Sequence, residues 1–160
     1  MISDAQELSF IQVGSELEAL LLEARLIRSY KPKYNIISKD DKHPLYIQIT
    51  KEKYPRVITV RKIDLESEPS LANYGPFPSS KNVRSVLKMI RRIFPYSDHK
   101  LGKRPCLYSH IGLCDPCPNE IVQSTQYLVL RKKYLKNIRS IKSILDGHID
   151  EVKKNLEKEM

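Results

Sequence analysis

Three cysteines gathered in one short segment constrain this chain more than any other feature of its sequence. They are its only cysteines, and they fall as Cys106, Cys114 and Cys117 within RPCLYSHIGLCDPC. Residues 95–118 hold few core-forming side chains and look too irregular to fold without a staple. Two thiolates separated by two residues chelate one metal ion well, and a third nearby supplies most of a site. The sequence therefore predicts a metal or cluster site, with three buried reduced thiols as the alternative.

The fourth ligand of such a site is not a cysteine, and His99 and His110 are the candidates. Zinc accepts three Cys and one His, whereas an iron–sulfur cluster usually takes four Cys but tolerates substitution. Both cofactors remain open at this point. The odd, low cysteine count argues against a disulfide framework, and no apolar run is long enough to span a bilayer. We expect a cytoplasmic protein with no membrane partner.

Positive charge is concentrated in one part of the chain. The formal net charge is +9, but residues 81–142 alone hold fourteen Lys or Arg and only three Asp or Glu. A concentrated positive field attracts polyanions, and nucleic acid is the commonest of these partners. We therefore expect a nucleic-acid-binding surface, with a well-solvated basic face as the simpler alternative.

The N-terminal part is predicted to combine a short strand with one helix. Residues 7–13 are interpreted as the strand, and Gly14 ends it. Ser15 and Glu18 have the spacing of a capping box, so a helix should follow over 16–30. This helix has two apolar sides, which indicates packing on both. One side carries Leu17, Leu20, Leu21, Ala24 and Ile27, and the other Ala19, Leu22 and Leu26.

A hairpin is predicted next. Residues 45–50 alternate apolar and polar side chains, as a half-buried strand does, and a turn leads into a second strand over 57–60. The acidic, Pro-containing stretch 63–78 is interpreted as a linker.

Helices dominate the remainder of the predicted structure. They are expected over 80–93, over 121–145 with Gly147 as the C-cap, and from residue 149 to the last residue. The first two carry Lys and Arg opposite an apolar face, and such residues neutralise phosphates without reading base sequence. The candidate DNA contacts are Lys81, Arg84, Lys88, Arg91, Arg92, Arg131, Lys132, Lys136 and Arg139. Tyr96, Tyr108, Tyr127 and Tyr134 could stack on bases, but core packing is the simpler interpretation.

Glu23 stands out because no basic residue lies one helical turn away to pair with it. A carboxylate between two apolar stripes must bind a divalent cation, pair with a distant lysine or raise its pKa. Asn35 follows in KPKYN, where a turn residue is the simpler interpretation.

Long segments of the chain resemble one known family. ELEALLLEARLIRSYKPKYNIISKDDKHPLYIQITKEKYPRV, YGPFPSSKNVRSVLKMIRRIFPY and RPCLYSHIGLCDPCP, in that order, are similar to the UvrC family. That family supplies the incision subunit of bacterial nucleotide excision repair. The resemblance implies an α+β fold with a partial GIY-YIG nuclease layer, followed by an α-helical, cysteine-containing region.

The resemblance also implies roles for two residues and a division into segments. Glu23 matches the family's glutamate that binds Mg²⁺ or Mn²⁺, and Asn35 matches its catalytic asparagine. Residues 1–62 would be the C-terminal part of the nuclease domain, 63–78 a linker, and 79–118 the basic helix with the cysteine segment. Residues 119–160 would lead into a UVR motif that docks on UvrB, and damaged double-stranded DNA would be the substrate of the 3′ incision.

The sequence departs from the family pattern at both the nuclease and the cysteine segment. The family's catalytic tyrosines and arginine would lie before Met1, so we expect this chain alone to be inactive or nearly so. A non-catalytic DNA- or UvrB-binding module and a fragment of a split reading frame are the alternatives. The family's first cluster cysteine falls at or near His99, and the last two cysteines stand one residue closer together than usual. Cluster type therefore stays open between iron–sulfur and zinc.

Overall fold

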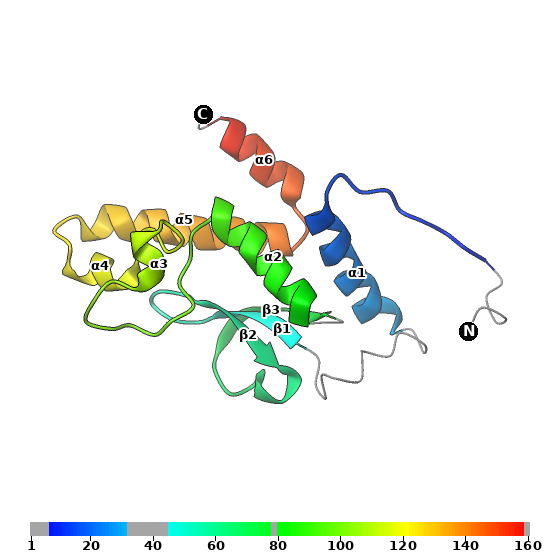
Figure 1. Ribbon diagram of the computed structural model, residues 1–160, viewed down its shortest axis with the longest axis horizontal. Helices are drawn as coiled ribbons and strands as arrows, with labels where there is room; N and C mark the ends of the chain where they lie inside the picture. The colour runs from blue at the N-terminus through cyan, green and yellow to red at the C-terminus, as the bar shows by residue number, and fades with distance from the viewer. Residues whose placement is uncertain (1–6, 32–44, 78–79, 159–160) are drawn as a thin grey trace.

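The structure, a computed structural model, describes residues 7–31, 45–77 and 80–158 (Figure 1). Its elements in chain order are α1 (Glu16–Tyr30), β1 (Leu45–Thr50), β2 (Val57–Arg61), the short 3₁₀ helix η2 (Lys62–Asp64), β3 (Ser70–Phe77), α2 (Ser80–Ile93), α3 (Leu107–His110), α4 (Pro118–Gln123), α5 (Tyr127–Leu145) and α6 (Ile149–Glu157). A small sheet with helices packed on it confirms the predicted α+β class.

The sheet is antiparallel, in the order β2-β1-β3. The predicted hairpin is confirmed, with Ile47 opposite Thr59. The stretch 63–78 is not a linker without secondary structure, because it contributes β3, which pairs along the other edge of β1. The sequence did not indicate this strand, because the stretch 63–78 is acidic and the side chains of β3 are mostly half-exposed.

The prediction that β1 is half-buried is wrong. Its polar side chains Gln48 and Thr50 are as fully buried as Ile47 and Ile49. The polar face is covered by the chain that follows β2, since Gln48 Nε2 donates to the Leu65 carbonyl oxygen at 3.1 Å. The Thr50 hydroxyl oxygen accepts from the Arg56 amide at 2.9 Å, whereas Gln48 Oε1 is buried without a hydrogen-bond partner among the described residues.

The predicted capping box of α1 is confirmed, but the predicted strand before it is not. The Ser15 hydroxyl oxygen accepts from the Glu18 amide at 3.2 Å, and the Glu18 carboxylate accepts from the Gly14 amide at 2.7 Å. Residues 7–13 pair with no strand in the part of the chain that the structure describes, and Leu8 and Phe10 are exposed. An apolar run forms a strand only where the edge of a sheet is available to pair with it.

Helix α2 lies across the sheet (Figure 1). Its own residues Val83, Val86 and Ile90 are fully buried. Ile93, the last residue of the helix, is 54% exposed. The predicted helix over 121–145 is two helices, because α4 ends at Gln123 and α5 begins at Tyr127. The Ser124 hydroxyl oxygen accepts from the Gln126 amide at 3.0 Å, which stabilises the turn between them.

Helix α5 also contributes to the core. Its Tyr134, Ile138 and Ile141 belong to the buried apolar cluster, together with Ile47 and Phe77 of the sheet. The C-cap of α5 is Asp146, and Gly147 follows it with a positive φ of 93°, so the glycine predicted to end the helix stands one residue after the cap. None of the helices described is long and apolar enough to cross a membrane.

Candidate metal centre and nucleic-acid surface

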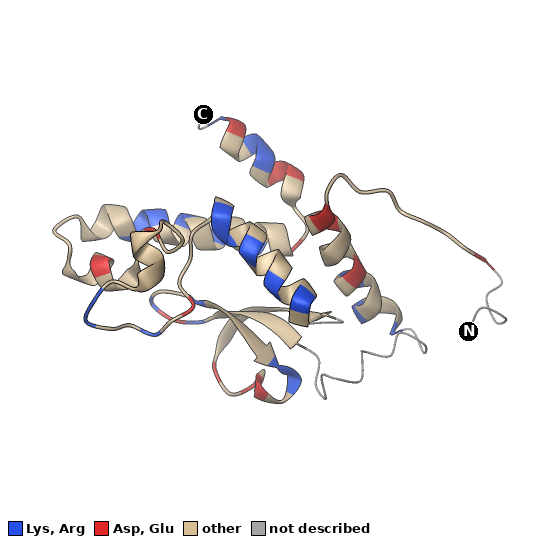
Figure 2. Ribbon diagram, in the orientation of Figure 1, with Lys and Arg blue, Asp and Glu red and all other residues tan. Residues whose placement is uncertain are grey.

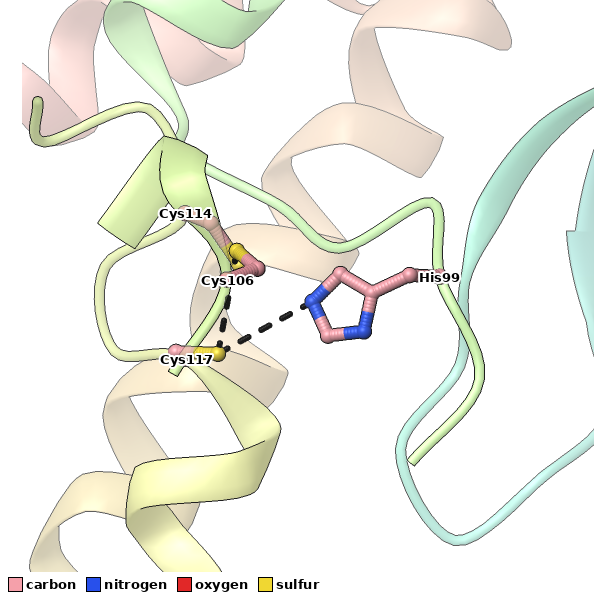
Figure 3. A group of neighbouring side chains, drawn as sticks. All are labelled: His99, Cys106, Cys114 and Cys117. Atoms are coloured by element: carbon pink, nitrogen blue, oxygen red, sulfur yellow. Dashed lines mark hydrogen bonds between the residues drawn. The ribbon is translucent and has the colours of Figure 1, made fainter. Parts of the chain in front are cut away.

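His99, Cys106, Cys114 and Cys117 come together in one group (Figure 3). Their potential ligand atoms all lie within 4.8 Å of one another. Cys117 Sγ is 3.8 Å from His99 Nε2 and 3.9 Å from Cys106 Sγ. A zinc–sulfur bond of about 2.3 Å places tetrahedral ligands roughly 3.8 Å apart. The four donors therefore fit a single tetrahedral ion.

The structure decides between the two candidate histidines. His99 points its Nε2 at the thiols, whereas His110 at the end of α3 is exposed and outside the group. The His99 Nδ1 atom lies 2.8 Å from the Lys100 carbonyl oxygen. A backbone contact at Nδ1 holds the proton there and leaves Nε2 as a ligand, which is a common arrangement around protein metals.

The thiols sit where they are costly to ionise without a cation. Burial raises the pKa of Cys114, and the neighbouring sulfurs of Cys117 and Cys106 raise it further. Burial also raises the pKa of Cys106, although the Ser109 amide opposes this. A bound cation reverses that balance, because it replaces the thiol protons and satisfies several thiolates at once.

A buried asparagine that sequence analysis missed supports the segment. Asn119, on α4, is 4% exposed. Its Oδ1 accepts from the Gly102 amide at 2.8 Å, and its Nδ2 donates to the Arg104 carbonyl oxygen at 2.6 Å. The side chain thus fixes the loop between His99 and Cys106. Its position two residues after the last cysteine was the only available signal.

The basic stripe on α2 is exposed along most of its length (Figure 2), at Lys81, Arg84, Lys88 and Arg92. Arg91 differs, because its side chain is only 11% exposed and its Nη2 lies 2.8 Å from Asp98 Oδ2. The stripe borders a hollow of about 690 Å³ between β2, α2 and the cysteine segment. Four of the five predicted α2 contacts are therefore presented to solvent, and the fifth is held internally.

The predicted basic face of α5 is partly exposed. Lys132, Lys136 and Arg139 are exposed and Arg131 is half-buried. Lys133, which was not among the candidates, pairs with Asp115 at 2.8 Å and so contacts the cysteine segment. Among the tyrosines, Tyr96 and Tyr134 are buried in the core, whereas Tyr108 is 40% exposed beside the hollow.

Glu23 lies on the exposed side of α1 and outside the group formed by His99 and the three cysteines, which we call the Cys/His cluster. It lines an apolar hollow of about 480 Å³ with Phe10, Leu22 and Leu26. Within the described residues Glu23 has no salt-bridge partner, as its lack of helical neighbours predicted. The second apolar side of α1 thus faces this hollow rather than a packed layer. Asn35 lies outside the described residues, so its catalytic role stays a prediction.

Two family models match the chain. The model of the UvrC/Cho excinuclease middle domain matches residues 44–135, more than half of the chain, and covers the sheet, α2 and the cluster. The chain belongs to the UvrC family. The model of the UvrC-like GIY-YIG domain matches residues 1–36, which include Glu23 and Asn35. The predicted UvrC resemblance is confirmed.

Curated relatives agree with this assignment. The chain is similar to the UvrABC system protein C of Thermoanaerobacter sp. (strain X514) and of Thermoanaerobacter pseudethanolicus, at 39% identity over 170 residues each. It is 38% identical over 169 residues to the protein of that name from Caldanaerobacter subterraneus subsp. tengcongensis. Each alignment covers 100% of this chain but only 26% of the relative. No solved structure matches the chain.

Proposed function

We propose that this chain serves nucleotide excision repair as part of a UvrC-type endonuclease that makes the 3′ incision beside a DNA lesion. The observation that carries the proposal is the exposed basic face of α2, which borders a hollow beside the Cys/His cluster inside the UvrC middle-domain match. Exposed cations at helical spacing suit a phosphate backbone, and they bind it without regard to base sequence.

In this proposal Glu23 holds the Mg²⁺ or Mn²⁺ ion of the nuclease. Its exposure, its position in a hollow and its lack of an ion-pair partner among the described residues support that role. A divalent ion there would polarise the scissile phosphate. Asn35 would complete the site, and UvrB would present the damaged DNA while α6 and the residues after it dock on UvrB.

The Cys/His cluster would hold a structural metal, and its geometry favours one zinc ion over an iron–sulfur cluster. Donors bound to separate irons must stand further apart than donors that share one ion. The distances of 3.8 and 3.9 Å between Cys117 Sγ and its two neighbours match the second case. A closed four-ligand site without a free position suits a structural role.

Binding of a duplex that carries one lesion tests the proposed surface. Removing Arg84 and Lys88 together, as a double alanine variant, should lower the slope of log affinity against log salt by about two. The control variant removes Lys154 and Lys158, two exposed lysines of the C-terminal region, and should leave the slope unchanged. Equal slopes in the two variants would contradict the proposal.

A second candidate is a DNA- or UvrB-binding module without cleavage of its own. The α2 hollow and the Cys/His cluster favour it, because both lie within the middle-domain match, residues 44–135, and apart from Glu23. A nicking assay with Mn²⁺ tests the second candidate, because robust cutting by this chain would eliminate a module without cleavage of its own. We expect little or no cutting by this chain alone, a result that both candidates allow.

A further inference from the structure

Arg91 is held between two aromatic rings rather than offered to solvent. Its guanidinium carbon lies 4.2 Å from the ring centroid of Tyr96 and 4.5 Å from that of Tyr108. Asp98 pairs with Nη2 at 2.8 Å. A planar cation stacked on two rings and paired with a carboxylate is fixed in position, since each partner removes a direction of movement.

All three partners of Arg91 belong to the segment that carries the metal ligands. Asp98 directly precedes His99, and Tyr108 lies on α3, whose N-cap is Cys106. The Tyr108 carbonyl oxygen also accepts from the Cys114 amide at 3.1 Å. An ion that fixed these ligands would therefore also fix the groups that hold Arg91.

Arg91 joins this segment to the basic helix across the hollow described above. Arg84, Lys88 and Arg92 line the α2 side of the hollow, and Tyr108 and Leu113 line the cysteine-segment side. The backbone of Arg91 is part of α2, the first wall. Its side chain contacts the cysteine segment, the second wall. Arg91 therefore helps to set the spacing between the two walls, together with the Tyr96 hydroxyl, which donates to the Leu87 carbonyl oxygen of α2 at 3.5 Å.

We propose that Arg91 is a positioning residue that couples occupancy of the Cys/His cluster to the affinity of the α2 hollow for a DNA strand. The inference rests on the proposed binding of DNA by α2. Loss of the ion releases Asp98 and Tyr108, so the wall they form is no longer held against the helix. Because coupling between two binding events is reciprocal, bound DNA should also raise the affinity of the cluster for its metal. We expect the tighter binding to appear as slower release of the metal.

Release of zinc from the zinc-loaded chain to a colorimetric chelator measures one side of this coupling. Arg91→Lys keeps the charge but loses the planar stack, and should accelerate release about tenfold, within the usual range of such couplings. Arg61→Lys is the matched control, since Arg61 is an exposed arginine that does not line the hollow, and it should release zinc at the wild-type rate. Saturating duplex DNA should slow release from the wild type but much less from Arg91→Lys.

Fluorescence anisotropy with the same duplex measures the other side. Removing zinc, or Arg91→Lys, should weaken binding several-fold with little change in the salt slope, because the charge of the α2 face is retained. Asp98→Asn should give the same result without altering Arg91, and circular dichroism should show that each variant is folded.

The outcomes separate the inference from the function beneath it. Wild-type zinc release from both Arg91→Lys and Asp98→Asn, or unchanged DNA affinity after zinc removal, would overturn the coupling. The proposed DNA surface would survive either result if the Arg84 and Lys88 double variant still lowered the salt slope. Salt-insensitive binding by the wild type would instead overturn the proposed function.

Discussion

The Tyr134 hydroxyl donates a 2.7 Å hydrogen bond to the Pro55 carbonyl oxygen, which joins α5 to the turn of the β1–β2 hairpin. The same hydroxyl accepts from the Ser97 amide at 3.4 Å, two residues before His99, the proposed metal ligand. Tyr134 is fully buried. One side chain thus ties together the helix layer, the sheet and the start of the cysteine segment.

Tyr134→Phe should destabilise the fold by about 1–3 kcal/mol, because it leaves a buried carbonyl and a buried amide with one partner fewer. Urea unfolding followed by circular dichroism measures the difference. Tyr30→Phe removes a hydroxyl from a side chain that is 78% exposed, and should change stability by less than about 0.5 kcal/mol. Equal effects from the two variants would mean that the buried hydroxyl adds nothing.

Metal analysis of protein purified without oxygen should find one zinc per chain. Cys114→Ser should abolish that zinc, since it removes a fully buried ligand. His110→Ala should retain it, because His110 lies outside the group of four ligands. Iron with inorganic sulfide at cluster stoichiometry would contradict the single-ion interpretation.

Acid should remove a contribution that Glu18 makes to stability. The Gly14 amide, and to a lesser extent Lys153, lowers the pKa of Glu18 below its usual value of 4.5. A carboxyl whose pKa is lower in the folded than in the unfolded state stabilises the fold above 4.5 and loses that effect as pH falls through the folded value.

Glu18→Gln should therefore be less stable than the wild type at pH 7, and the gap should shrink steadily below pH 4.5. Urea midpoints across this range measure it. Glu16→Gln, in the same first turn of α1, is the control. A gap that stays constant down to strong acid would mean that the charge of Glu18 is not responsible.

Glu23→Gln should weaken the binding of Mn²⁺. Electron paramagnetic resonance of the free ion measures this affinity. Loss of a carboxylate ligand should cost about tenfold or more, since even outer-shell changes at metal sites cost that much. Glu16→Gln, which removes another carboxylate of the same helix, should bind Mn²⁺ as the wild type does. Unchanged affinity in Glu23→Gln would remove this residue from the proposed nuclease site.

Local signals in the sequence predicted the elements that depend on local chemistry. The capping box at Ser15 and Glu18 fixed the start of α1, and Gly147 marked the end of α5. The hairpin and α2 also formed where the periodicity of apolar residues placed them. The sequence pointed equally to the three cysteines, because two thiols at close spacing and a third nearby are a chemical signature by themselves.

Long-range packing decided the rest. The sequence left the fourth ligand open between His99 and His110, and only the folded loop brought His99 to the thiols. Strand β3 formed in an acidic stretch because the second edge of β1 was available for pairing. Residues 7–13 formed no strand because they pair with no sheet edge in the described part of the chain. In the sequence Arg91 is not distinguishable from the other basic residues of α2. In the folded chain two tyrosines and an aspartate of the cysteine segment surround its side chain. Local sequence fixes a residue's own backbone and face, but its partners come from chain segments whose approach only tertiary packing determines.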